Sequence, residues 1–279
     1  MSIVVNTNVA SLMVQRNLSK ATSSLQTSMQ RLSTGMKINN AGDDAAGLAL
    51  SEKINGQLSA SDVCKNNAQT GINMLNIADG DLDIINQNLQ RIKDLAVQSA
   101  NGVYSDSERL SMDQEVQLRI EEINRIASSS TFSDVNLLDG TIADMKLQIG
   151  TGSDEAQNTI DISDAFQEAT ATALGVTAGA SISTAANARA MIDLIDTAVN
   201  NISTRRSVIG ASVNRLNSTV DRLDVRKENL QSTYSTIRDT DIASESTKPL
   251  YHFCSCLTIN SSSSARKAMT SSYIVFFRN

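Results

Sequence analysis

The chain has 279 residues, a net charge of −6, no tryptophan and 3% aromatic residues. It is long enough for one or two domains, but Ala, Leu, Ile, Val and Met must provide nearly all of its core, which favours long helices packed side by side. Residues 1–247 contain 20 of the 24 basic groups and all 30 acidic groups. This acidity argues against a nucleic-acid partner, which requires a basic face.

The first 43 residues predict one helix followed by a break. A weak apolar stripe at helical spacing ends near Gly35; its members are Leu18, Ala21, Leu25 and Leu32. The sequence NNAGDDAAG at 39–47 then predicts a break and a new helix, with Asp43 or Asp44 near its N-terminus.

The next segment predicts a long coiled-coil helix. Apolar residues alternate at spacings of three and four, the 3.5-residue period of a left-handed coiled coil. They are Leu75, Ala78, Leu82, Ile85, Leu89, Ile92 and Ala96. Cys64 lies on the backward extension of this stripe, and we interpret it as a small buried hydrophobic residue. Asn101-Gly102 predicts a turn, and a third helix should run from Ser107 to Ala127.

Between Thr131 and Ile162 the pattern changes to the two-residue period of strands. Met145, Leu147 and Ile149 alternate with polar residues, GTGSDEAQN at 150–158 predicts a loop, and the alternation resumes at Ile160. This predicts a β-hairpin with a long turn at about 131–162. Residues 163–181 should form a short connector of small residues.

The longest apolar stripe runs from Ala188 to Ile237, where only Arg206 and Lys227 interrupt the coiled-coil pattern. About 50 residues of helix would extend roughly 75 Å. Neither long stripe can bury its apolar face alone, so the two should pack together, and we expect the seam to support self-assembly as well. Its principal members are Leu75, Leu82, Ile85, Ile92, Ile195, Ile202, Ile209, Leu216, Leu223 and Leu230. The predicted fold is mainly α: a long antiparallel helical coiled-coil rod over 44–247 with a small β-hairpin element.

Residues for catalysis are scarce. The single histidine, His252, lies in the last 32 residues, which weakens acid–base, triad and zinc interpretations. Adjacent residues such as Asp43 and Asp44 point in different directions on a helix. We therefore interpret them as helix-capping residues rather than as a catalytic pair of carboxylates. The glycines of 150–158 lack the lysine of a phosphate-binding loop. We expect no enzyme activity, no cofactor and no metal site.

Four longer stretches resemble bacterial flagellin and occur in the order of that family. They are VVNTNVASL (4–12), LSTGMKINNAGDDAAGLAL (32–50), GINMLNIADGDLDIINQNLQRIKDLAVQSANG (71–102) and STIRDTDIASE (235–245). The resemblance covers about 1–162 and 182–247. It implies that segment 1–43 belongs to a filament core built from paired terminal helices. The connector at 163–181 leaves no room for outer domains, as in a minimal flagellin.

The resemblance also implies location and partners. A flagellin is a subunit of a homopolymer that serves swimming motility. It is exported by the flagellar type III route without a cleaved signal peptide, and it lies outside the cell. Implied partners are further copies, hook-junction and filament-cap proteins, and an export chaperone. The alternative is a hook–filament junction or helical adaptor protein of the same export system, although such proteins do not usually carry the segment LQRIKDLAVQSANG intact.

By the same resemblance, one surface should bind the animal Toll-like receptor for flagellin. The implied contact residues are Leu89, Gln90, Arg91, Leu95, Gln98 and Glu115. Leu89 also lies on the seam, where core packing is the competing interpretation and the one we favour. Arg91 lies off the seam, so we expect it to be exposed, and contact with a neighbouring subunit is its alternative role.

The last 32 residues depart from the family. After the DIASE motif a flagellin continues as an apolar helix, whereas this chain has TKPLYHFCSC, in which Pro249 would break a helix. We interpret 248–279 as a disordered segment translated in another reading frame, with a divergent terminus as the alternative. The helix at about Asn6–Met36 would then lack its partner, which predicts a soluble monomer that forms filaments poorly.

Overall fold

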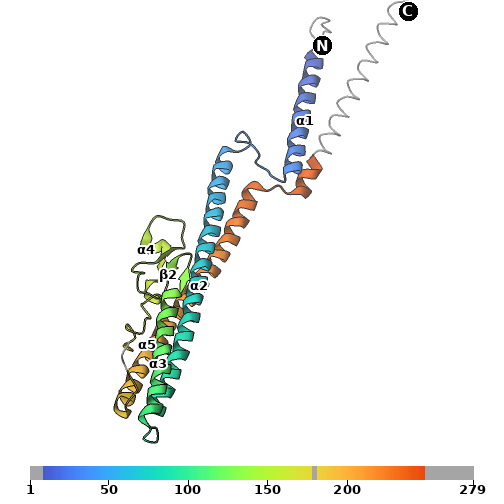
Figure 1. The fold of residues 1–279 in the computed structure, drawn as a ribbon. Coiled ribbons are helices and arrows are strands. Elements are labelled where there is room, and N and C mark those ends of the chain that lie inside the picture. Colours follow the sequence, from blue (N-terminus) through green and yellow to red (C-terminus); the bar gives the residue numbers. More distant parts are fainter. Residues whose placement is uncertain (1–8, 178–180, 249–279) are drawn as a thin grey trace, which may run out of the picture. The chain divides into compact units, whose positions relative to one another are not determined.

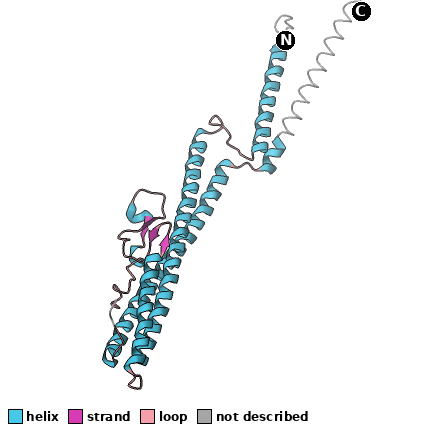
Figure 2. Ribbon diagram, viewed as in Figure 1, coloured by secondary structure: helices cyan, strands magenta, loops and turns pink. Residues whose placement is uncertain are grey.

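The computed structural model describes residues 9–177 and 181–248. Its contacts divide the chain into two compact units, one of residues 1–56 with 229–279 and one of residues 57–228. Helices make up most of the described chain, and the strands are short (Figure 2). The predicted mainly α fold with a small antiparallel β element is therefore confirmed.

Four long helices dominate the chain: α1 (Val9–Thr34), α2 (Ala45–Ser99), α3 (Asp106–Ser129) and α5 (Ala185–Arg238). In the unit of residues 57–228, α2, α3 and α5 run side by side (Figure 1). The predicted long helices are thus present, 55 residues long in α2 and 54 in α5.

The predicted breaks and caps have clear local causes. Gly35 follows α1 with a φ of 70°, a left-handed conformation that glycine adopts without a steric penalty. The Asp44 carboxylate accepts a hydrogen bond from the Gly47 N–H at the start of α2. Ser105 and Glu108 form a reciprocal capping box, so α3 begins at Asp106, one residue before the predicted start.

The core of residues 57–228 is the predicted apolar seam. All seven predicted seam residues of α2 between Leu75 and Ala96 are buried. On α5 the buried positions recur every seven residues, whereas the alternate positions are only half-buried. The buried set on α5 comprises Ile195, Ile202, Ile209, Leu216 and Leu223, and the half-buried set comprises Ile192, Val199, Val213 and Val220. Helix α5 therefore carries a fully enclosed series and a partly open one, although Arg206 interrupts the open series and Met191, Ala198 and Thr219 are further buried residues.

Along the chain, two small antiparallel hairpins follow α3 and precede α5. Strands β3 (Lys146–Gln148) and β4 (Thr159–Asp161) pair with Leu147 opposite Ile160, within the predicted hairpin region. The loop between them contains the short helix α4 (Glu155–Asn158), which the sequence did not predict. A second hairpin, β1 (Thr131–Phe132) with β2 (Val135–Asn136), was also not predicted. Its two turn residues, Ser133 and Asp134, have positive φ without the Asn-Gly signature of such turns.

The β3–β4 hairpin is fastened to α2. Asn67 donates a side-chain hydrogen bond to the Gln148 carbonyl at 3.0 Å. Leu147 packs so closely on Gly71 that a Cβ at that position would collide with the leucine side chain. Glycine at position 71 thus lets a strand approach the helix backbone.

The predicted connector is part of the core. It contains the 3₁₀ turn η1 (Ser163–Ala165), and its apolar side chains are buried beneath the helices. They include Phe166, Ala169, Ala171, Leu174 and Val176. The connector therefore packs as a structural element, although its small residues alone suggested a simple link.

In the unit of residues 1–56 with 229–279, the segments that follow α1 and α5 pair through an antiparallel bridge between Met36 and Asp239. The Lys37 N–H donates to the Arg238 carbonyl at 2.6 Å, and the Thr240 N–H donates to the Gly35 carbonyl at 2.9 Å. Most of α1 is exposed, including Val9, Leu12, Met13, Leu18 and Met29. The predicted aberrant tail lies outside the described residues except for Lys248.

The contrast between enclosed and open positions on α5 predicts unequal mutational costs. Leu216→Ala should lower the free energy of unfolding by about 2–5 kcal/mol, because it leaves a cavity in a closed seam. Val225→Ala, at an exposed position of the same helix, should change it by less than about 0.5 kcal/mol. Urea denaturation followed by the helical circular dichroism signal measures both values, and equal losses would contradict the seam.

Candidate interaction surfaces

Two features usually sought in a functional site are not found in the described part of the chain. No three His, Cys, Asp or Glu side chains among residues 9–177 and 181–248 are grouped so that they could hold a metal ion. Within the same ranges no helix is long and apolar enough to cross a membrane. Cys64 is buried as predicted, and burial raises the pKa of its thiol.

A ladder of ion pairs fixes the register of α2 against α5. Lys227 contacts Asp62 at 2.6 Å, and Lys93 contacts Asp196 at 2.5 Å. Lys93 lies 31 residues after Asp62 (93 − 62), and Asp196 lies 31 residues before Lys227 (227 − 196). The two helices are therefore antiparallel and keep one register over this length. Each exposed pair adds little stability, roughly 0–1 kcal/mol, so their main effect is on register.

The two charged residues that interrupt the α5 stripe belong to this ladder. Lys227 reaches Asp62, and Arg206 lies between two carboxylates of α2. The Arg206 guanidinium contacts Asp79 at 2.8 Å and Asp83 at 2.6 Å, and the hydrogen bond to Asp79 is the main cause of a raised Arg206 pKa. Both interruptions therefore follow from pairing with α2.

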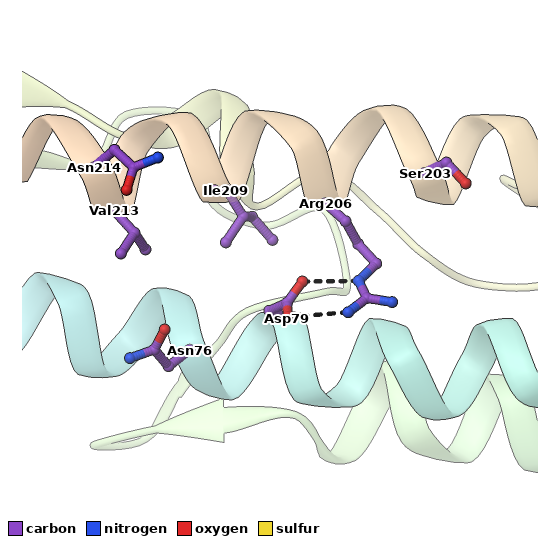
Figure 3. Close-up of a pocket in the computed structure, with 8 residues that line it drawn as sticks. Asn76, Asp79, Ser203, Arg206, Ile209, Val213 and Asn214 are labelled. Atoms are coloured by element: carbon purple, nitrogen blue, oxygen red, sulfur yellow. Dashed lines mark hydrogen bonds and ion pairs between the residues drawn. The ribbon is translucent and has the colours of Figure 1, made fainter.

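A groove of about 510 Å³ runs between α2 and α5 at this point (Figure 3). Its apolar residues, Ile209 and Val213, project from α5 toward α2, and the Arg206–Asp79 pair lies beside them. We call it the α2–α5 groove; it is lined by Asn76, Asp79, Ser203, Arg206, Ile209, Gly210, Val213 and Asn214.

A second surface lies on the outward face of α2. Val63, Ile77 and Ile84 are 56%, 41% and 47% exposed, and Thr70, also exposed, completes a series with seven-residue spacing. We call these four residues the outer stripe. The seam on the other side of α2 masks this stripe in the sequence, and its heptad spacing becomes visible only when the seam residues are known to be buried.

The predicted receptor residues divide between core and surface. Leu89 and Leu95 are buried, so their side chains pack inside the chain in this conformation. Gln90, Arg91 and Gln98 are exposed, as expected for Arg91, and Glu115 is half-buried on α3. The Gln98 amide donates to the Tyr104 hydroxyl at 2.9 Å, which ties α2 to the turn before α3.

Arg91 and Glu115 form a bidentate ion pair between α2 and α3. Arg91 Nε lies 2.9 Å from Glu115 Oε1, and Arg91 Nη2 lies 3.2 Å from Glu115 Oε2. The hydrogen bond from Arg91 is the main cause of a lowered Glu115 pKa. Arg119 approaches the same carboxylate at 3.8 Å. The sequence did not predict this pairing, since the two residues lie 24 positions apart on different helices.

The seam residues predicted to support self-assembly mostly lie inside one chain. Those of residues 57–228 are buried by the packing of the chain's own helices, and Leu230, in the other unit, is half-buried. In this conformation the buried side chains cannot reach a neighbouring molecule, so the contact surfaces must be sought elsewhere.

Two parts of the chain match models of known protein families. Residues 5–143 match the bacterial flagellin N-terminal helical region, and residues 192–250 match the bacterial flagellin C-terminal helical region. The chain belongs to the bacterial flagellin family. The two matched regions contain α2 and most of α5, so the family pattern coincides with the antiparallel helix pair.

Individual relatives extend over most of the chain. A flagellin of Halalkalibacterium halodurans is 39% identical over 243 residues, covering 87% of this chain and 88% of the relative. A flagellar filament core protein of Brachyspira hyodysenteriae is 37% identical over 260 residues, covering 88% and 90%. A solved structure assigned as a flagellar hook-associated protein of Vibrio parahaemolyticus shares the fold, with a TM-score of 0.59 and 16% identity over 71% of this chain and all of that one.

The ladder predicts that Arg206 contributes more to register than to stability. Arg206→Met should change the free energy of unfolding by less than about 1 kcal/mol, because Asp79 and Asp83 are partly exposed and water can solvate them. Methionine also restores an apolar side chain to the stripe. Thermal and urea denaturation provide the measurement, and a loss above about 2 kcal/mol would show that the ion pairs, rather than the seam, hold the helices together.

Proposed function

We propose that this chain is a structural subunit of the bacterial flagellar filament that assembles with copies of itself into a helical polymer for swimming motility. The observation that carries the proposal is the match to both flagellin helical regions, at 5–143 and 192–250. Relatives that match over 88–90% of their own length include a flagellin and a flagellar filament core protein.

The physical basis for a polymer is the exposure of apolar helix surface on a chain whose core is already closed. The outer stripe remains accessible in the unit of residues 57–228 after the seam has been buried. A contact that joins two different faces of identical molecules produces a helical array when its rotation does not close into a ring. Hook-junction proteins, filament-cap proteins and an export chaperone would be its further partners, and the type III route its path out of the cell.

A hook-associated role is the second candidate. It is favoured by the fold shared with the hook-associated protein of Vibrio parahaemolyticus, at a TM-score of 0.59. That similarity has 16% sequence identity, whereas the relatives at 37–39% identity are filament proteins. A filament subunit should add along filaments, and a junction protein should bind only at their ends.

Co-assembly tests the proposed function. The purified full chain, labelled with a fluorescent dye, is mixed with sheared filaments and unlabelled soluble flagellin from flagellated cells, and the filaments are sedimented and imaged. We expect label distributed along newly grown filament. Label confined to the filament ends would favour the junction role, and no bound label would contradict both.

The exposed α1 surface suggests that assembly of this chain alone is inefficient. Its apolar residues include Leu12, Met13 and Leu18, and the sequence of residues 248–279 departs from the apolar pattern that the resemblance implies there. We expect salt-precipitated chain to remain mostly in the supernatant after sedimentation. Replacing residues 248–279 with the C-terminal segment of the Halalkalibacterium relative should shift the chain into the pellet, and long filaments from the unaltered chain would refute this expectation.

We also propose that the exposed residues of α2 and α3 form the contact for the animal Toll-like receptor, as the resemblance implies. Gln90, Arg91, Gln98 and Glu115 would contact the receptor, while Leu89 and Leu95 would support this surface from the core. Arg91 uses Nε and Nη2 to bind Glu115, so Nη1 can donate to an acceptor on a partner.

A matched pair of variants tests this contact. Arg91→Ala should weaken receptor activation by about tenfold or more in a reporter-cell assay, because an arginine at the centre of an interface is often a dominant contact. Arg125→Ala is the control, since Arg125 is also exposed and ion-paired, with Glu122 on α3. Equal potency of the Arg91 variant and the unaltered chain would exclude this site.

A further inference from the structure

The outer stripe is a linear apolar surface. Val63, Thr70, Ile77 and Ile84 follow one another at seven-residue intervals on a single helix. The stripe therefore extends over 21 residues (84 − 63), or about 31 Å. It contains no charged side chain, and Val63, Ile77 and Ile84 are branched at Cβ, which leaves them few rotamers to lose on contact.

The α2–α5 groove lies within a series of the same period on α5. Val199, Arg206, Val213 and Val220 are half-buried and spaced by seven residues, over 21 residues (220 − 199). Arg206 and Val213 line the groove, and Val199 and Val220 continue the series on either side of it. Half-buried Val213 supplies the apolar surface of the groove, above the enclosed Ile209, while Asn76, Ser203 and Asn214 supply polar groups beside it. Apolar side chains of one helix pack well between those of another when both repeat with the same spacing.

The charges of the groove are compatible with binding of an uncharged surface. Its one basic side chain, Arg206, is already paired with Asp79 and Asp83, as Figure 3 shows for Asp79. Covering the groove with the outer stripe would therefore bury Arg206 and Asp79 as a pair, while Asp83 lies outside the groove lining and stays accessible to water.

The geometry points to a lateral contact in which the outer stripe of one copy docks along the α2–α5 groove of a second copy. This inference rests on the proposed filament function and names the surfaces that it would use. Asn76 in the groove precedes Ile77 in the stripe by one residue, about 100° around the helix. The two surfaces thus face different directions on one molecule, so the contact is head-to-tail in kind and continues from copy to copy.

Substitution of the stripe tests the contact. In the co-assembly assay, Ile77→Glu with Ile84→Glu should reduce incorporation of the full chain at least about tenfold, because two carboxylates would be buried without partners. The matched control is Leu110→Glu with Leu118→Glu, which alters two exposed leucines of α3 outside the stripe. Circular dichroism confirms that both variants remain helical. An equal loss in both variants, or none in the stripe variant, would overturn the inference.

Photo-crosslinking identifies the partner surface directly. A photoreactive amino acid replaces Ile77 in one copy, and an isotopically heavy copy of the full chain is co-assembled with it. We expect crosslinked peptides of the heavy copy to come from residues 199–220. Crosslinks only to other segments would overturn the stripe–groove pairing while leaving filament assembly intact. Failure of the unaltered chain to join filaments would instead refute the proposed function, and this inference with it.

Discussion

The unit of residues 57–228 depends on the apolar seam between α2 and α5. With almost no aromatic residues, the chain must build its core from mid-sized side chains that interlock every seven residues, such as Leu82 on α2 and Ile209 on α5. Helix α3, the hairpin held at Gly71 and the connector around Phe166 all pack on this pair. The ion pairs that flank the seam contribute little energy individually, but they select one antiparallel register.

Burying the seam separates the residues that hold the subunit together from those that can bind a neighbour. If both apolar positions of each α5 heptad were fully buried, the seam would expose no apolar side chain to another molecule. Here every second position is only half-buried, and α2 carries an additional stripe on its outward face. The same helices can therefore form a stable unit and still provide apolar contact surface for assembly.

The Arg91–Glu115 pair holds the exposed surface of α2 and α3 in one arrangement. The bidentate bond joins α2 to α3 and holds a long side chain that would otherwise lose conformational entropy on binding. A partner that contacts this surface meets a fixed guanidinium edge rather than a mobile one. Buried Leu95 supports it from below, so substitutions there would act through the position of the helix and not through direct contact.

The sequence by itself determined the long helices, their seam and the break at Gly35, because heptad spacing and helix-ending residues are local signals. It also carried the flagellin motifs. Only the tertiary structure decided that Leu89 and Leu95 are enclosed, that Arg206 pairs with Asp79 and Asp83, and that a groove remains beside them. These features depend on which residues of distant helices meet, and an antiparallel register is set by contacts between residues more than 100 positions apart.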